Sequence, residues 1–471
     1  MSVSNNPAMG RPPRQGALID DWRPEDPHFW GSTGKAIATR NLWISIPALF
    51  LAFAVWMVWS TVIVRLNAIG FGFSTDELFW LAALPGLSGA TLRIFYSFMV
   101  PVFGGRRWTA LSTASLLIPA LWMGLAVQSP NTPYSVFVVI ALLCGFGGGN
   151  FASSMSNISF FYPKAQQGTA LGLNAGLGNL GVSAMQFLVP LSIGIGLFGA
   201  AGGRPQELAD GSQLWLQNAG FIWVPLIAVV TLVAWFGMND LGSAKASFAE
   251  QAVIFKRKHN WLMCWLYLAT FGSFIGFAAG FPMLIKTQFP GVDPLKFAFL
   301  GPLVGALVRP LGGWISDKLG GARVTLWNFV VMIAAVFGVI AFLPQGGQGG
   351  NFYGFLAMFM LLFVTTGIGN GSTFRMIPVI FRTLHERWSA GKGAAAREQA
   401  LRESGKESAA VLGFSSAIGA FGAFFIPKSF GTSISLTGGP EMALYVFVGY
   451  YVSCILVTWW WYSRKGAETP C

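Results

Sequence analysis

Two arginines, Arg93 and Arg309, lie deep inside long apolar stretches that contain no Asp, Glu or His. A cation in the middle of a bilayer costs roughly 2.5–3.5 kcal/mol on insertion scales, and proteins usually offset that cost with a carboxylate. Because neither stretch offers one, we expect the negative charge to come from outside the chain. That expectation points to a membrane carrier for an anion. The alternative is that both side chains reach toward lipid headgroups or bond backbone carbonyls.

Arginine suits such a site because its guanidinium group offers five N–H donors in a planar fork and stays protonated when desolvated. Two opposed guanidinium groups can hold one small oxyanion through charge-assisted hydrogen bonds. A lysine would provide only a point charge, and it could lose its proton on burial.

The composition places the chain in lipid. Of its 471 residues, 54% are hydrophobic and 10% are charged, whereas a soluble domain has about 25% charged residues. The net charge of +12 is spread over short loops between apolar runs, which is typical of topology signals, so we expect no nucleic-acid partner. The four cysteines form no CxxC or Cys/His cluster. We therefore expect no metal site, no cofactor and no disulfide framework, and the absence of catalytic motifs argues against an enzyme.

Twelve apolar runs approach the length of about 20 residues that crosses a bilayer. They lie near 42–64, 78–103, 108–127, 134–161, 169–198, 219–238, 261–285, 295–316, 324–343, 352–381, 408–435 and 441–463. The fold class is therefore an all-α membrane protein with twelve transmembrane helices. The longest loop, 382–407, is predicted to be a short exposed helix of mixed charge.

The basic residues predict the orientation. Twenty-two of the 30 Lys and Arg residues fall on one side of the predicted membrane, five fall on the other side, and three lie within spans. This bias predicts that both termini lie in the cytoplasm. The tryptophans at 459–461 precede Arg464 and Lys465, as expected of interfacial anchors. Residues 1–41 contain no apolar signal segment, so we expect a cytoplasmic tail.

The polar segment 239–260 divides the chain into two six-span halves that resemble each other. An ungapped alignment of 85–109 with 301–325 gives eight identities in 25 positions, and it pairs Arg93 with Arg309. The glycines at 145, 147 and 149 likewise correspond to those at 367, 369 and 371. Two pseudo-symmetric bundles would bring both arginines to one central cavity. The predicted domains are 1–41 (tail), 42–238 (first bundle), 239–260 (linker), 261–463 (second bundle) and 464–471 (tail).

Three motifs carry a resemblance to a known family. The spacing of Gly313, Asp317, Gly320 and Arg323 resembles the loop signature of the major facilitator superfamily, although Pro101 replaces the acid in the first half. AGLGNLG at 175–181 is similar to the span-five signature of the nitrate/nitrite porters. GFSSAIGAFGAFF at 413–425 resembles its second copy, with Ala423 where a glycine is expected. The resemblance extends from residue 21 almost to the C-terminus.

The resemblance implies the fold, the substrates and the site. It implies alternating access to one central site, with nitrate and nitrite as ligands of Arg93 and Arg309. The other implied site residues are Phe151, Phe271, Tyr267 and Asn179. The implied gating loop contains Asp317 and Arg323. Phe rings above and below the anion would favour flat ions and exclude water.

The glycine motifs have two possible roles. Small residues on a helix face allow close and sliding contacts, so these glycines either form a moving contact or pack statically. The residues concerned are Gly172, Gly176, Gly178, Gly181, Gly413, Gly419 and Gly422. Arg375 is a third arginine within a span, and snorkelling to the interface is its simplest interpretation.

Coupling can be inferred from charge. No acidic residue or histidine lies at mid-membrane, so a proton relay has no obvious carrier. An empty site would hold two unpaired cations, which favours obligate exchange of nitrate for nitrite. We expect the functional unit to be a monomer. The alternatives are a nitrate/proton symporter, a carrier of another small monovalent anion, and a membrane sensor without transport activity.

Overall fold

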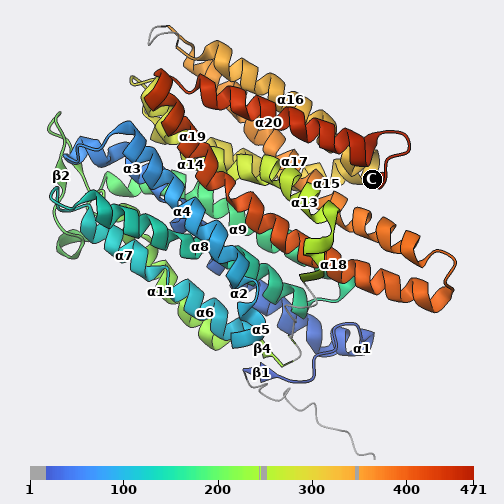
Figure 1. Cartoon of the computed structure of the whole chain (residues 1–471). Coiled ribbons are helices and arrows are strands. Elements are labelled where there is room, and N and C mark those ends of the chain that lie inside the picture. Colours follow the sequence, from blue (N-terminus) through green and yellow to red (C-terminus); the bar gives the residue numbers. More distant parts are fainter. Residues whose placement is uncertain (1–16, 243, 245–251, 345–348) are drawn as a thin grey trace, which may run out of the picture.

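The computed structural model describes residues 17–242, 244, 252–344 and 349–471 (Figure 1). Within these residues, twelve helical segments are long and apolar enough to span a membrane, which confirms the predicted number of spans. The strands are β1 (Leu18–Ile19), β2 (Gln206–Glu207), β3 (Gln213–Leu214) and β4 (Asp240–Leu241).

The first six spans form what we call the first half. Their helices are α2 (Lys35–Met57) with α3 (Trp59–Leu66), α4 (Thr75–Tyr96), α6 (Gly105–Ala114) with α7 (Leu117–Ala126), α8 (Tyr134–Phe161), α9 (Lys164–Ile193), and α10 (Asn218–Phe221) with α11 (Trp223–Gly237). Of two further short helices, α1 (Pro27–Phe29) precedes the first of these helices and α5 (Met99–Phe103) lies between α4 and α6.

The last six spans form the second half. Their helices are α13 (Lys258–Tyr267) with a π-helical turn (Leu268–Gly272) and α14 (Ser273–Gln288), α15 (Leu300–Leu319), α16 (Gly321–Phe342), α17 (Phe352–Ser389), α18 (Ala394–Ala420) with α19 (Gly422–Thr437), and α20 (Glu441–Thr458). The remaining helical turns are Trp30–Gly34, Asn67–Ile69, Gly199–Gly202, Ala252–Lys256, Pro294–Lys296 and Trp459–Ser463.

Several helices extend beyond the predicted apolar runs. The first span begins at Lys35, earlier than the predicted start at 42. The prediction of one short helix over 382–407 is wrong, because α17 continues to Ser389 and α18 begins at Ala394. Hydropathy detects only the part of a helix that lies in lipid, whereas polar turns in water continue the same backbone hydrogen bonds.

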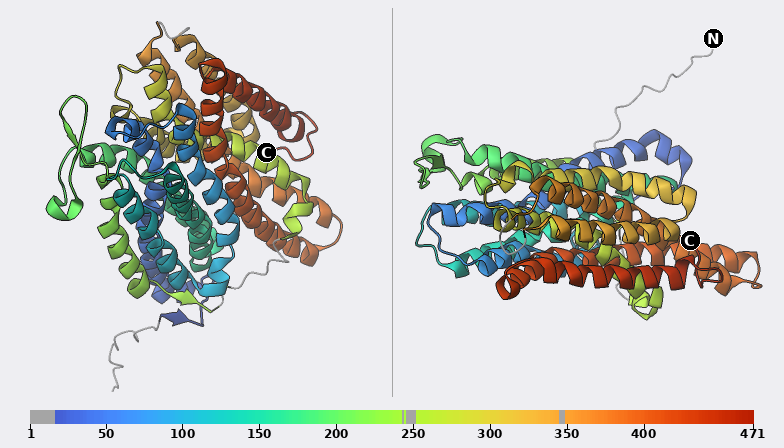
Figure 2. Two further views of the ribbon diagram at one scale, coloured as in Figure 1. Left: turned by 60° about the vertical axis from the view of Figure 1, so that its left-hand side comes forward. Right: turned by 90° about the horizontal axis from the view of Figure 1, so that it is seen from above.

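Both terminal segments lie on the same side of the bundle. Strand β1 pairs in parallel with β4, which follows the sixth span, and the carbonyl oxygen of Cys471 accepts a hydrogen bond from the Ala322 amide. In Figure 1, β1, β4 and α1 lie at one end of the bundle and β2 lies at the other. Figure 2 shows the helices of both halves running between these two ends.

The two halves repeat the same close packing between their second and fourth spans. In the first half, α4 packs against α8, and a Cβ added at Gly148 would lie 2.7 Å from the Cα of Gly89. In the second half, α15 packs against α17, and a Cβ at Gly367 would lie 2.3 Å from the carbonyl oxygen of Gly305. Arg93 lies four residues after Gly89, and Arg309 lies four residues after Gly305. The same packing therefore positions both arginines.

The loop after each second span also repeats. Gly104 and Gly320 both have φ of 88°, in the region that favours glycine. In the first half, where Pro101 replaces the expected acid, Asp240 supplies a carboxylate from outside the loop. Its Oδ1 accepts from the Arg106 amide at 2.8 Å, at the start of α6.

The outer surface of the bundle is apolar. Large exposed side chains on α11 include Leu226, Val229, Leu232 and Phe236. An apolar surface of this kind fits contact with lipid.

Candidate anion-binding site

Arg93 extends from α4 into the centre of the molecule and is fully buried. Its Nε donates to the carbonyl oxygen of Gly148 on α8 at 2.9 Å, and its Nη1 donates to the carbonyl oxygen of Ser416 on α18 at 3.0 Å. Nη2 has no hydrogen-bond partner among the described residues. The alternative of bonding backbone carbonyls therefore applies to part of the Arg93 fork, and one nitrogen remains available to a ligand.

Three aromatic rings lie against the Arg93 guanidinium. Its Cζ is 4.7 Å from the ring centre of Phe151, 5.2 Å from that of Trp56 and 5.6 Å from that of Phe271. A buried cation gains from such contacts because the ring faces carry partial negative charge, which helps to hold the guanidinium in a dry site.

Arg309 is held less tightly. Its Nη2 donates to the hydroxyl oxygen of Tyr267 at 3.3 Å, and its Cζ lies 5.0 Å from the ring centre of Phe374. Its Nη1 is buried without a hydrogen-bond partner in the described part of the chain. Each half therefore contributes one guanidinium nitrogen that is buried and unpartnered.

The aromatic rings connect the two arginines. Tyr267, which bonds Arg309, stacks on Phe271 with ring centres 5.4 Å apart and planes 9° apart. Phe271, which lies against Arg93, stacks on Phe151 at 6.4 Å. The structure thus brings Arg93, Arg309, Phe151, Phe271 and Tyr267 to one centre.

Neither arginine has an ion-pair partner in the described part of the chain. Across residues 17–242, 244, 252–344 and 349–471, every ion pair involves other cations. A small anion is the natural counter-charge for a dry site with two guanidinium groups.

The backbone of the second half makes room for the rings. Tyr267 directly precedes the π-helical turn of the seventh span, and Phe271 lies within that turn. Such turns often occur at functional sites. Opposite them, a Cβ at Gly419 would lie 2.9 Å from the Tyr267 ring and 3.3 Å from the Phe271 ring. The second glycine motif thus lets α18 approach both rings, on the same helix that presents the Ser416 carbonyl to Arg93.

Three members of this centre were not predicted from the sequence: Trp56, Phe374 and the Ser416 carbonyl. Phe374 directly precedes Arg375 and lies close to the repeated glycines of span ten, which is the only signal that could have indicated it. Trp56 and Ser416 reach the site only through tertiary packing.

The role of Asn179 at the site stays a prediction. The residue is buried on α9, its Oδ1 has no partner, and no hydrogen bond within the described residues joins it to Arg93 or Arg309.

The motif glycines pack mainly within one half. A Cβ at Gly178 would meet the Leu49 side chain of α2, and one at Gly181 would lie 2.1 Å from the Phe50 carbonyl oxygen. Gly422 abuts the Gly272 backbone in the second half. These contacts fit the static alternative. A Cβ at Gly172, Gly176 or Gly413 would meet nothing within 4 Å.

A close backbone approach between the halves lies elsewhere. A Cβ at Gly86 on α4 would lie 2.4 Å from the carbonyl carbon of Ala423 on α19. Ala423 is the position where the family pattern expects a glycine, and Gly86 provides the small residue on the opposite helix.

The loop residues have separate surroundings. Asp317 forms an ion pair with Arg375, which gives that arginine a partner in place of simple snorkelling. Arg323 is exposed on α16. Because the Asp317–Arg375 pair is solvent-exposed, its contribution to stability is about 0–1 kcal/mol.

The two halves are joined by ion pairs at the end that holds β2. Arg65 pairs with Asp293 at 2.9 Å, and Lys428 pairs with Asp76 at 2.7 Å; each pair links one half to the other. Lys286 also donates to the Val64 carbonyl across the same junction.

At the opposite end, the ion pairs of the described residues each stay within one half and its flanking segments. Arg106 pairs with Asp240 at 3.2 Å, and Arg257 pairs with Glu407 at 2.7 Å. Ion pairs therefore join the halves at the β2 end, whereas no ion pair between described residues joins them at the end that holds β1 and Cys471.

Comparisons with known proteins agree with this arrangement. Residues 44–397 match the family model described as the Major Facilitator Superfamily. A nitrate/nitrite transporter, NarU, of Salmonella typhimurium is 59% identical over 95% of this chain and 96% of its own length. The chain belongs to the nitrate/nitrite porters of the major facilitator superfamily.

Two further relatives extend the comparison. A probable nitrate/nitrite antiporter, NarK2, of Thermus thermophilus is 41% identical over 97% of this chain and 99% of its own length. A solved bacterial homologue of the lysosomal transporter Spinster, in an inward-facing and occupied conformation, has a TM-score of 0.59 at 16% identity, covering 88% of this chain and 93% of that one. The latter shares the fold alone.

Proposed function

We propose that this porter carries nitrate and nitrite across the membrane and exchanges one for the other at the Arg93–Arg309 centre. The observation that carries the proposal is the pair of buried, unpartnered nitrogen atoms, Nη2 of Arg93 and Nη1 of Arg309, one from each half. The names of the relatives, nitrate/nitrite transporter and probable nitrate/nitrite antiporter, agree with this assignment.

The anion binds where it can accept from both free nitrogens. Nitrate and nitrite are small, flat or bent, and rich in acceptor oxygens, so one ion can bridge two guanidinium groups. The rings of Phe151, Phe271 and Tyr267 surround this position and exclude water. A bulkier or more strongly hydrated ion, such as sulfate, would lose more on entering the ring-lined centre.

Exchange follows from the charge of the centre. An empty site retains two cations with no carboxylate partner, and closing it against water leaves both unneutralised. A bound monovalent anion offsets one charge and supplies acceptors to the free nitrogens. The empty carrier therefore does not reorient, and each outward nitrite is matched by an inward nitrate.

We assign the end that holds the termini to the cytoplasm, because 22 of the 30 Lys and Arg residues lie on that side. The β2 end, with its two ion pairs between the halves, then serves as the outer gate. Residues 42–238 and 261–463 rock as two bundles about the central site of a monomer in a bacterial inner membrane.

Counterflow tests the proposal directly. Purified protein in liposomes loaded with nitrite should take up labelled nitrate, and liposomes loaded with an impermeant buffer alone should not. A pH dye in the lumen should stay constant during uptake. Uptake without internal anion, or acidification that tracks nitrate, would favour the proton symporter. Preference for formate or chlorate over nitrate in competition would favour another anion.

A further inference from the structure

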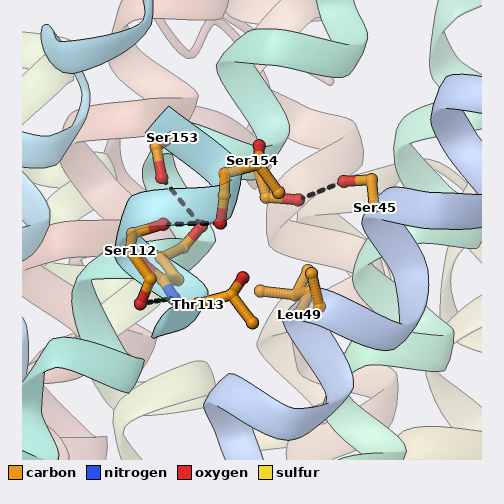
Figure 3. Close-up of a pocket in the computed structure, with 9 residues that line it drawn as sticks. Ser45, Leu49, Ser112, Thr113, Ser153 and Ser154 are labelled. Atoms are coloured by element: carbon orange, nitrogen blue, oxygen red, sulfur yellow. Dashed lines mark hydrogen bonds between the residues drawn. The ribbon is translucent and has the colours of Figure 1, made fainter. Parts of the chain in front are cut away.

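A small polar cavity lies inside the first half, among α2, α6 and α8 and away from the two arginines' donors. Its lining residues are Ser45, Ala48, Leu49, Thr109, Ser112, Thr113, Asn150, Ser153 and Ser154. Figure 3 shows Thr113 and Leu49 facing one another across it, with serine hydroxyls around the rim. The cavity offers about 10 Å³ to the centre of a water-sized sphere, which is room for one water molecule.

Two polar atoms in this lining lack partners. Among the residues that the structure describes, the Oδ1 of Asn150 and the Oγ1 of Thr113 have no hydrogen-bond partner, although the two residues are only 5% and 1% exposed. Buried polar groups are nearly always hydrogen-bonded, so each such exception requires an explanation.

The neighbouring groups are already engaged with one another. Ser45 and Ser154 share a hydrogen bond of 2.8 Å, and Asn174 donates to the Ser154 hydroxyl at 2.8 Å. The Ser153 hydroxyl donates to the backbone carbonyl oxygen of Asn150 at 3.2 Å. Reorienting one of these to serve Asn150 or Thr113 would leave another group unpaired.

The second half fills the same position with protein. In the register that pairs Arg93 with Arg309, Thr109 corresponds to Thr325; in the register of the span-four and span-ten glycines, Asn150 corresponds to Ser372. There the two hydroxyls bond directly, with Thr325 Oγ1 and Ser372 Oγ 2.7 Å apart. In the first half, Asn150 Nδ2 donates only to the Ser112 backbone carbonyl, at 3.4 Å, and Asn150 Oδ1 has no partner among the described residues.

We propose that this cavity binds one ordered water molecule. The water donates to Asn150 Oδ1, and its second hydrogen or its oxygen bonds the Thr113 hydroxyl. Asn150 lies between Gly148, whose carbonyl accepts from Arg93, and the neighbouring ring residue Phe151. The water therefore fixes the stretch of α8 that supports the anion centre, whereas a direct side-chain contact does so in the second half. The water site itself does not depend on which anion is carried.

A high-resolution structure of the full chain in lipidic mesophase tests the site, with Thr113→Val as the key variant. We expect an isolated density peak within about 2.7–3.2 Å of both Asn150 Oδ1 and Thr113 Oγ1. The peak should be lost in Thr113→Val. It should remain in Thr231→Val, which removes another buried, unpartnered hydroxyl, on α11 and outside this cavity.

Three outcomes would overturn the proposal. The first is an empty cavity in the wild-type chain, in a map that shows other buried waters. The second is a peak that persists in Thr113→Val. The third is a peak that disappears when sodium is replaced by choline, which would identify a cation. The wild-type map decides the question even if Thr113→Val fails to fold.

Discussion

Replacing Arg93 by lysine keeps the charge and removes the fork, so it isolates the geometry of the site. The wild-type side chain bonds two carbonyl oxygens, those of Gly148 and Ser416, and still has Nη2 free. A lysine ammonium is a single nitrogen on a flexible stem, and it cannot occupy all three positions at once. At least one charge-assisted hydrogen bond is lost, either to the anion or to a buried carbonyl.

A hydrogen bond to a charged group contributes about 1.5–3 kcal/mol, and every 1.4 kcal/mol is a factor of ten in affinity. We therefore expect Arg93→Lys to raise the half-saturating nitrate concentration in counterflow by about 10–150-fold. Arg107→Lys is the matched control, since Arg107 is exposed outside the membrane, with 62% of its side chain accessible. A change of less than about threefold in a monodisperse Arg93→Lys protein would refute the assignment of this fork to the anion.

Three other changes test the remaining geometry. Phe151→Leu removes the ring nearest to the Arg93 guanidinium, so nitrate binding should weaken by about 2–30-fold. This range corresponds to a cation–π contact of ~0.5–2 kcal/mol, and unaltered binding would contradict the ring's role. Asp293→Asn removes one outer ion pair that is about 30% exposed, so the outward-facing population should rise by at most about fivefold. Maleimide labelling of a cysteine placed in the outer cavity measures this population, and reduced labelling would argue against a gate. Gly422→Ala places a Cβ 2.2 Å from the Gly272 backbone and should lower the melting temperature, because overpacking costs ~1–3 kcal/mol. Gly413→Ala, whose Cβ would meet nothing within 4 Å, should leave the melting temperature nearly unchanged, and equal effects would contradict the packing.

Sequence alone could predict the features that depend on local patterns. Span number follows from apolar length, and the pairing of Arg93 with Arg309 follows from the repeat; the shared φ of Gly104 and Gly320 shows that the repeat extends to the backbone. Helix ends were less predictable, because α17 continues into water to Ser389 without any change in backbone bonding.

The rest of the centre depends on contacts between distant segments. Nothing in the sequence near Trp56 indicates that its ring would lie 5.2 Å from Arg93, since the contact depends on the packing of α2 against α4 and α8. A backbone carbonyl such as that of Ser416 has no sequence signature at all. The glycine motifs were recognisable, but which helix each one approaches is set by tertiary structure, as at Gly419 beside the Tyr267 ring.

The repeat also produces an asymmetry that bears on mechanism. Arg93 is fully buried, bonded to both halves and surrounded by three rings, whereas Arg309 has one long hydrogen bond and one ring. In the proposed mechanism, Arg93 is therefore the fixed side of the centre, and Arg309 is the side that can move with less loss. An anion that bridges Nη2 of one to Nη1 of the other couples the fixed side to the mobile side. Without the anion, Arg93 still bonds the Ser416 carbonyl of the second half, whereas the hydrogen bond described for Arg309 stays within its own half. This loss of coupling is a physical reason to expect exchange over one-way flow.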